Sequence, residues 1–266
     1  MEKLSDVMQK VFPIEPLSEE VCGTCGNPYI IYDTPRGELG ACKHCLDQEL
    51  YDSLHIATKA ERKKEKDMRF ASSFERVSND LTASTLTSYE PRHSTQVRAK
   101  YVATAYVERF TGYHSLLFSG GPGLGKSHLS YAIVKSLREK GFHTLYIKVT
   151  DLFDRLKQAY RPHAEQTEEQ IFHMLEWLDV LVLDDLGSEY VRVNDSGHET
   201  WATDVLFKIF DSRLNKATIC TTNYSEQMLV EKYGVHGERI IDRLLDMTTV
   251  TRVEGESYRR RREHVI

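Results

Sequence analysis

From about residue 95 onward, short apolar runs alternate with stretches in which apolar residues recur every three or four positions. The short runs are nearly continuous in apolar and β-branched residues, which is typical of parallel strands covered on both faces. The longer spacing is typical of helices that bury one face. The predicted strands are 115–118, 144–149, 179–183 and 217–222. The predicted helices are 127–140, 151–160 and 201–214, together with one that begins near residue 95 and one that begins at Thr167, where Thr167 and Gln170 form a capping-box pattern. This alternation predicts an α/β domain with a mostly parallel sheet.

The chain before residue 95 has a different pattern. Residues 1–58 contain two Cys-x-x-Cys pairs, and residues 59–70 carry six basic and three acidic side chains without an apolar stripe. The latter stretch therefore predicts a solvated helix or a linker. Residues 71–93 are rich in Ser and Thr, which is typical of irregular structure. We expect a small domain at 1–58, a linker at 59–93 and the α/β domain at 94–266.

A glycine-rich segment follows the first predicted strand. Residues 120–127 read GGPGLGKS and match the phosphate-binding loop pattern in its required strand–loop–helix context. Glycines let the backbone N–H groups approach phosphate oxygens, while Lys126 would neutralise the phosphates and Ser127 would offer its hydroxyl to Mg²⁺. The candidate nucleotide-binding residues are Gly120, Gly121, Pro122, Gly123, Leu124, Gly125, Lys126, Ser127 and His128.

Two later strands end in polar residues. Asp184 and Asp185 follow the strand at 179–183, where the first could hold Mg²⁺ and the second could polarise an attacking water molecule. Asn223 follows the strand at 217–222, at the edge where α/β sheets place ligand chemistry, and could orient that water or the γ-phosphate. Such residues also occur in ordinary turns, but the phosphate loop upstream favours the functional interpretation.

The four cysteines near the N-terminus have the spacing of a metal site. Sixteen residues separate the two pairs, which lies within the range for tetrahedral zinc sites. Four protein ligands leave no open position, so the site is expected to be structural. His44 could replace a ligand, and unpaired thiols are the alternative. The expected ligands are Cys22, Cys25, Cys42 and Cys45, whereas Cys220 lies in an apolar strand and is expected in the core.

Composition narrows the functional classes. The chain has 266 residues, of which 40 % are hydrophobic, and its net charge of −5 argues against a wholly basic protein that coats nucleic acid. We find no apolar run of 18 residues and no apolar secretory segment near residue 1, so neither a membrane contact nor export is expected. A reducing, cytoplasmic setting would favour metal-bound cysteines over disulfides.

Several arginines lie late in the chain. Arg239 and Arg243 fall in an apolar-striped stretch, and Arg259 to Arg262 lie in a basic tail. Such arginines are usually solvated, but an added guanidinium accelerates phosphoryl transfer by about 10³–10⁵.

In their order, GGPGLGKSHL, LVLDDLG, ATICTTN, GERIIDRL and ESYR resemble the AAA+ ATPases of the DnaC/DnaI type, which load the bacterial replicative helicase. The resemblance covers roughly residues 70–266 and implies a P-loop domain with a parallel sheet and a reduced C-terminal lid. The cysteine segment resembles the zinc-binding, helicase-contacting domain of the DnaI branch. A phage-encoded copy would look the same.

The resemblance also implies roles for single residues. Lys126 and Ser127 match Walker A, and Asp184 matches the Mg²⁺-coordinating Walker B acid. Asp185 occupies a position that is Glu in most AAA+ proteins. Asn223 matches sensor 1, Arg243 the arginine finger that reaches a neighbouring subunit, Arg259 sensor 2, and 150–160 the region around the initiator/loader-specific helix, where Tyr160 is a candidate for base stacking. Two departures are Leu124, where a small polar residue is common, and the added Arg260 to Arg262.

The function that the resemblance implies is ATP-dependent delivery of a DnaB-type hexameric helicase onto single-stranded DNA. The expected cofactors are ATP, Mg²⁺ and Zn²⁺, and the expected partners include an initiator protein and further copies of this chain assembled on the helicase. Three alternatives stay open. They are a transposition-helper ATPase of the IstB type, a nucleotide-gated adaptor with little turnover, and, more remotely, a zinc-dependent transcription factor.

Overall fold

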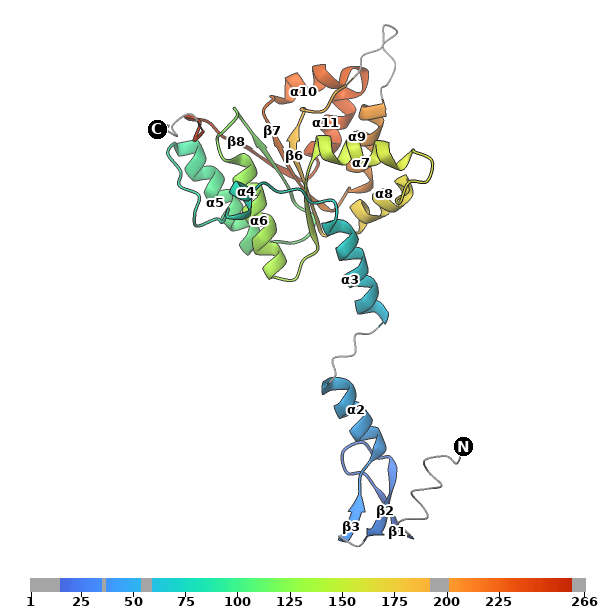
Figure 1. The fold of residues 1–266 in the computed structure, drawn as a ribbon. Helices are drawn as coiled ribbons and strands as arrows, with labels where there is room; N and C mark the ends of the chain where they lie inside the picture. Colours follow the sequence, from blue (N-terminus) through green and yellow to red (C-terminus); the bar gives the residue numbers. More distant parts are fainter. Residues whose placement is uncertain (1–14, 35–36, 54–58, 192–200, 260–266) are drawn as a thin grey trace, which may run out of the picture. The chain divides into compact units, whose positions relative to one another are not determined.

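The computed structural model describes residues 15–34, 37–53, 59–191 and 201–259 (Figure 1). The chain divides into two compact units, Met1–Lys64 and Glu65–Ile266.

The first unit is a small antiparallel sheet followed by a helix. Its strands, in the order β1-β2-β3, and its helix are β1 Glu15–Val21, β2 Pro28–Thr34, β3 Gly37–Gly40 and α2 Lys43–Ser53. Among residues 16–34 and 37–50, Cys42 is the only buried side chain, and large apolar residues such as Val21 and Leu39 are exposed. This described part therefore lacks an apolar core of its own, so another interaction must hold it together.

The second unit is built on a five-stranded sheet. Its strands are β4 Ser115–Ser119, β5 Thr144–Lys148, β6 Val180–Leu186, β7 Ala217–Thr222 and β8 Thr248–Arg252. They lie in the order β5-β6-β7-β4-β8, and every neighbouring pair is parallel. The predicted parallel α/β fold is confirmed, and the four predicted strands are present. The edge strand β8 and the three strands of the first unit were not predicted.

The helices of the second unit are α3 Lys59–Ser72, which begins in the first unit, α4 Asn79–Thr82, α5 Ser94–Glu108, α6 Lys126–Glu139, α7 Val149–Ala159, α8 Glu168–Trp177, α9 Trp201–Ser212, α10 Glu226–Tyr233 and α11 Gly237–Leu245. The helices predicted near 95, at 127–140, 151–160 and 201–214, and after Thr167 are present within a few residues, whereas α4, α10 and α11 were not among the predicted ranges. The predicted capping box is present, because Thr167 and Gln170 each accept a backbone hydrogen bond from the other. In the part of the chain that the structure describes, none of these helices is long and apolar enough to cross a membrane.

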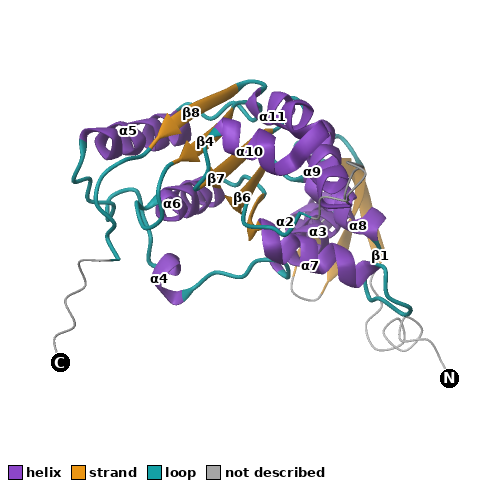
Figure 2. Ribbon diagram, turned by 90° about the horizontal axis from the view of Figure 1, so that it is seen from above, coloured by secondary structure: helices purple, strands orange, loops and turns teal. Residues whose placement is uncertain are grey.

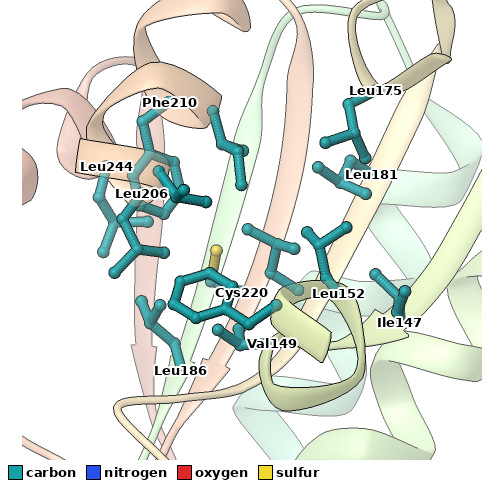
Figure 3. Packing of buried hydrophobic residues seen from close by; sticks show 14 of the residues in the cluster. Ile147, Val149, Leu152, Leu175, Leu181, Leu186, Leu206, Phe210, Cys220 and Leu244 are labelled. Carbon is teal, nitrogen blue, oxygen red and sulfur yellow. The ribbon is translucent and has the colours of Figure 1, made fainter. Parts of the chain in front are cut away.

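Alternating residues along each strand face two separate apolar clusters. On β6, Val180 and Val182 belong to the cluster that α5 and α6 cover. Leu181 and Leu183 belong to the cluster on the other face, which α7 to α11 cover (Figure 2). Cys220 packs in this second cluster, fully buried as expected (Figure 3). Burial on both faces explains why the strands read as continuous apolar runs.

The segment 59–93 was expected as a linker, but part of it packs into the second unit. Its first part forms helix α3, whose described side chains are mostly exposed. A solvated helix was one of the two predicted possibilities. The following residues are largely irregular, but Phe74 and Tyr89 are almost fully buried in the two clusters. The Ser/Thr-rich composition concealed these few apolar side chains, which pack this part of the segment into the second unit.

Candidate active site and metal centre

The predicted phosphate-site residues converge at one edge of the sheet. Strands β6, β7 and β4 are parallel neighbours, so their carboxyl ends lie side by side. The segment 120–125 follows β4, Asp184 and Asp185 lie near the end of β6, and Asn223 follows β7. Residues from three distant parts of the sequence therefore meet at the edge where parallel sheets place ligands.

Two glycines of the loop lie at positions where a side chain would not fit. Gly123 and Gly125 have φ angles of +77° and +83°. A Cβ atom at Gly123 would lie 2.0 Å from Oγ of Ser257, and one at Gly125 would lie 2.4 Å from the ring of Tyr89. The backbone N–H of Tyr258 also donates to the carbonyl of Gly123 at 2.9 Å. The loop is thus packed closely by the segment before α5 and by the residues after β8.

Lys126 is the buried cation of the site. Its Nζ donates to the carbonyls of Gly120 and Gly121 at 2.7 Å and to Oδ1 of Asn223 at 2.8 Å. The pKa of Lys126 is lowered to about 8, chiefly by burial; the two aspartates oppose this lowering, and the charge of Arg259 adds to it. A buried ammonium surrounded by neutral oxygens is suited to meet an anion, because added negative charge would restore its pKa.

Asp184 receives hydrogen bonds from three hydroxyl groups. Oδ1 accepts from Ser127 at 2.8 Å and from Thr221 at 2.6 Å, and Oδ2 accepts from Tyr146 at 2.6 Å. The side chain is almost fully buried. Burial and the carboxylate raise the pKa of Tyr146 far above its ordinary value, so its hydroxyl is a donor at every physiological pH.

Asp185 and Asn223 form the more open part of the site. Asp185 has a φ of +61°, and its N–H donates to Oγ1 of Thr221 at 2.9 Å. Its Oδ1 accepts a hydrogen bond of 2.9 Å from Nδ2 of Asn223. The left-handed backbone at Asp185 accompanies an irregularity in the pairing of β6 with β7, and it lets consecutive aspartates serve different partners.

These residues fit a magnesium nucleotide. The hydroxyl of Ser127 and the carboxylate of Asp184 are the oxygen donors that Mg²⁺ prefers, and they lie within hydrogen-bond distance of each other. Lys126 and the glycine-rich backbone fit the phosphates.

The two remaining arginine candidates lie in different places. Arg259 is exposed, and it directly follows Tyr258, whose backbone N–H donates to Gly123 of the phosphate loop. Arg243, on α11, donates through Nε to Asp211 at 3.1 Å and lines a pocket with Leu214 and Asn215, just before β7 begins. Because a six-residue strand such as β7 is about 20 Å long, Arg243 lies at the opposite edge of the sheet from Asn223. Residues 260–262 lie outside the described part.

Two members of the predicted loop set do not face the phosphate edge through their side chains. Leu124 is buried in the core. His128 lies on α6 with Nε2 at 2.9 Å from the carbonyl of Thr85, and its ring packs against Tyr89. Their expected contribution to nucleotide binding is thus limited to the backbone, and the Leu124 side chain, where a small polar residue is common, belongs to the core.

The four predicted zinc ligands form one cluster. All four sulfurs lie within 4.8 Å of one another, with 3.6 Å between Cys22 and Cys45 and 3.4 Å between Cys25 and Cys42. Tetrahedral zinc with Zn–S bonds of about 2.3 Å would separate its sulfurs by about 3.8 Å. His44 is exposed and is not part of this cluster.

The thiols also have the electrostatics of a cation site. The backbone N–H groups of Cys25 and Thr24 lower the pKa of the Cys22 thiol to about 6. The neighbouring thiols of Cys25 and Cys22 raise the pKa of Cys45 to about 12. Four thiolates would therefore repel one another unless a cation lay between them, and the donor set fits zinc.

Sequence reasoning missed Tyr146 and Thr221. Both lie within predicted strands, where they read as ordinary strand formers. The signal that was available is the alternation of side chains along a strand, which places every second residue on the same face of the sheet. The pairing register, which brings Tyr146 beside Val182 and so near Asp184, is not visible in the sequence.

Comparison with known proteins agrees with this geometry. The family model of the IstB-like ATP binding protein matches residues 44–265. The replicative helicase loader DnaC of Escherichia coli is 33 % identical over 156 residues, which cover 56 % of this chain and 58 % of the loader. An insertion-sequence ATP-binding protein of Sinorhizobium fredii is 35 % identical over 153 residues, 56 % of this chain and 48 % of that protein. The chain thus spans less than two thirds of both relatives.

A solved structure gives the same result for the fold. The crystal structure of the DnaC helicase loader superposes with a TM-score of 0.57 at 29 % identity and covers 66 % of this chain and all of that one. The resemblance to the DnaC type of AAA+ protein is confirmed. With a family model that covers most of its length, this chain belongs to the family of IstB-like ATP-binding proteins.

Proposed function

We propose that this protein is an ATPase that delivers a hexameric replicative helicase onto single-stranded DNA. The observation that carries the proposal is the combination, in one chain, of the phosphate site of the second unit with the four-cysteine cluster of the first. The relation to DnaC supports it.

Nucleotide binding is assigned to the backbone of residues 120–125, to Lys126 and to Ser127. Mg²⁺, held by Ser127 and Asp184, would supply charge neutralisation on the phosphates. Lys126 exchanges the carbonyls of Gly120 and Gly121 for phosphate oxygens, and its released partner Asn223 then becomes free to contact the reacting group.

Hydrolysis is assigned to Asp185 and Asn223. The amide of Asn223 orients the carboxylate of Asp185, which is partly exposed and so within reach of water. Asp185 polarises the attacking water molecule, and Asn223 fixes its direction. Arg259 lies near the same loop and would stabilise charge on the phosphates of its own subunit.

Arg243 acts on a neighbouring subunit. Its position at the far edge of the sheet prevents it from reaching the phosphates that its own subunit binds. A nucleotide held by one copy and contacted by Arg243 of the next copy would tie subunits together, and hydrolysis would break that tie.

A group of aromatic and basic side chains at the end of α7 and the start of α9 is the proposed site for single-stranded DNA. Tyr160 is 55 % exposed, and its hydroxyl accepts a hydrogen bond of 3.4 Å from the indole of Trp201. The ammonium of Lys157 lies 5.4 Å from the centre of the Trp201 ring. An exposed ring beside cations can stack a base and hold the adjacent phosphate.

We assign helicase binding to the zinc unit within residues 1–58. Leu46 and Leu50 are one turn apart on α2 and more than half exposed, and Val21 and Leu39 add exposed apolar surface. Such a surface suits a protein partner. Residues 94–266 would then form the ATPase domain. An initiator protein is a further expected partner for which we assign no surface.

The test is helicase loading in a purified system. Hexameric helicase from the same organism is added to circular single-stranded DNA coated with single-strand-binding protein, with or without this protein and ATP. Retention of helicase on the circle, dependent on this protein and on Lys126, supports the loader. No helicase complex by pull-down and no gain in loading overturns it.

The transposition helper is the second candidate, and the match to the insertion-sequence ATP-binding protein favours it. It requires double-stranded DNA and a transposase as partners. Phosphate release measured with single-stranded and with double-stranded DNA separates the two candidates, because each predicts stimulation by a different DNA form. Negligible release with both forms would instead support the nucleotide-gated adaptor.

A further inference from the structure

Tyr146 and Asp184 share one face of the sheet. Tyr146 on β5 pairs in register with Val182 on β6, two residues before Asp184. Because alternate strand residues point to the same side, the Tyr146 ring extends along this face toward the carboxylate. Its hydroxyl ends 2.6 Å from Oδ2.

The other carboxylate oxygen is held independently. Ser127 and Thr221 donate to Oδ1, from α6 and β7 respectively. Each oxygen of Asp184 is therefore fixed by a donor on a different structural element. With both oxygens bound, the carboxylate plane cannot rotate about its last torsion, which is otherwise broad.

Tyr146 is itself held at both ends. Its backbone N–H, on the outer edge of the sheet, donates to Oε1 of Glu75 at 3.2 Å. Glu75 in turn accepts two hydrogen bonds, of 2.6 and 3.0 Å, from the guanidinium of Arg138. The Tyr146 ring packs edge-to-face against Tyr131, with 5.3 Å between ring centres. The hydroxyl thus meets Asp184 from a rigid support.

Packing alone does not account for this tyrosine. The side chain is 1 % exposed within an apolar cluster, where a phenylalanine would fill almost the same volume without burying a hydroxyl. We propose that Tyr146 is a positioning residue for the magnesium site, whose hydroxyl locks Asp184 so that its Oδ1 stays beside Ser127. The proposal rests on the magnesium–nucleotide site proposed above.

The test compares the wild type with Tyr146→Phe, which removes only the hydroxyl. Mn²⁺ is the probe, and its binding is followed by electron paramagnetic resonance in the presence of a non-hydrolysable ATP analogue. Removing a group that orients a metal ligand typically lowers metal affinity about 10- to 100-fold. We expect Mn²⁺ binding to weaken about tenfold, while binding of the analogue in EDTA stays within twofold of the wild type.

Tyr131→Phe is the matched control, because it removes a hydroxyl from the neighbouring ring without touching Asp184. It should leave Mn²⁺ binding unchanged. Tyr146→p-aminophenylalanine keeps the ring and a donor and should restore Mn²⁺ binding to within threefold of the wild type, which also tests the proposal should the phenylalanine variant fail to fold.

The outcomes separate the two proposals. Equal Mn²⁺ affinity in the wild type and Tyr146→Phe, or no rescue by the amino analogue, overturns the role of Tyr146 alone. A wild type that binds no Mn²⁺ with the nucleotide analogue contradicts the proposed magnesium–nucleotide site itself.

Discussion

The ammonium group of Lys126 donates a hydrogen bond of 2.8 Å to the side-chain oxygen of Asn223, 97 residues later in the sequence. The same asparagine donates through its nitrogen to Asp185. One amide therefore connects the cation of the phosphate loop to the carboxylate assigned to water activation. Displacing Lys126 toward phosphates changes the surroundings of both residues.

Substitutions at the two ends of this contact should have different effects. Lys126→Ala should weaken ATP binding at least about 100-fold, because two or more charge-assisted hydrogen bonds to phosphate are lost. Asn223→Ala should leave binding within about threefold and slow hydrolysis about 100-fold, as expected for a group that acts on the reacting atoms. Fluorescent-nucleotide binding and phosphate release measure the two effects. Normal turnover in Asn223→Ala would remove this residue from the site.

The lowered pKa of Lys126 predicts proton uptake when nucleotide binds. Near pH 8 about half of the unliganded protein carries a neutral Lys126, since burial lowers its pKa to about 8. Phosphates stabilise the ammonium form, so binding at pH 8 should take up about half a proton, and binding at pH 6.5 almost none. Calorimetry in two buffers of different ionisation enthalpy measures this number. Equal uptake at both pH values would contradict it.

Zinc removal should affect only the first unit. The described part of that unit lacks an apolar core, so its fold should depend on the metal, whereas the second unit has two large clusters of its own. We expect one zinc per chain, and a strong chelator should abolish amide protection in residues 15–53 but not in β4 to β8. Hydrogen exchange measures both regions.

Two cysteine variants provide the controls. Cys42→Ser should lose the zinc while ATP binding stays intact. Cys220→Ala, at a buried thiol outside the cluster, should keep one zinc per chain. Full zinc content in Cys42→Ser would rule out the four-cysteine site.

Arg243 should act between subunits. Arg243→Ala should bind ATP normally but lose most partner- or DNA-stimulated turnover, since a guanidinium that contacts the transferred phosphoryl group contributes about 10³–10⁵ in rate. A mixture of Arg243→Ala with Lys126→Ala should regain part of the activity, because some interfaces then pair an intact loop with an intact arginine. Arg239→Ala, whose guanidinium packs on Phe207 of its own subunit, should not complement in this way. Failure of the mixture to exceed the sum of its components would place Arg243 outside the neighbouring site.

Tyr160 should contribute to binding of single-stranded DNA. Tyr160→Ala should weaken binding about 5- to 150-fold, because stacking of a base on an aromatic ring is worth about 1–3 kcal/mol. Tyr101→Ala removes another exposed tyrosine, on α5 across the sheet, and should have no effect. Fluorescence anisotropy with a labelled oligonucleotide measures both, and equal losses in the two variants would argue against a stacking site at Tyr160.

Local patterns predicted much of the second unit. Continuous apolar runs identified β4 to β7, because strands covered on both faces need no polar alternation. The strand β8 was missed because three of its five residues are threonine and its exposed edge position gives it no apolar run. Antiparallel β1 to β3 were missed for a related reason, since the described part of the first unit lacks an apolar core and so has little hydrophobic periodicity to detect.

Average composition did not predict that part of the expected linker packs into the second unit. Residues 71–93 read as irregular because Ser and Thr dominate, yet Glu75 pairs with Arg138 and with the backbone of Tyr146, and Tyr89 packs under the phosphate loop. Single contacts of this kind leave no trace in average composition, because one buried ring or ion pair suffices to dock a segment.

By itself, the sequence determined the chemistry that this protein carries. One local property is the spacing of the glycines, Lys126 and Ser127, which fits a strand–loop–helix segment. The other is the spacing of the four cysteines, which fits a pair of tight turns. The tertiary structure alone decided which residues meet. Strand order and register place Tyr146 and Thr221 on the carboxylate of Asp184 and put Arg243 at the far edge of the sheet. Such pairings depend on which strands become neighbours and at what offset, and that is settled by the packing of the whole sheet.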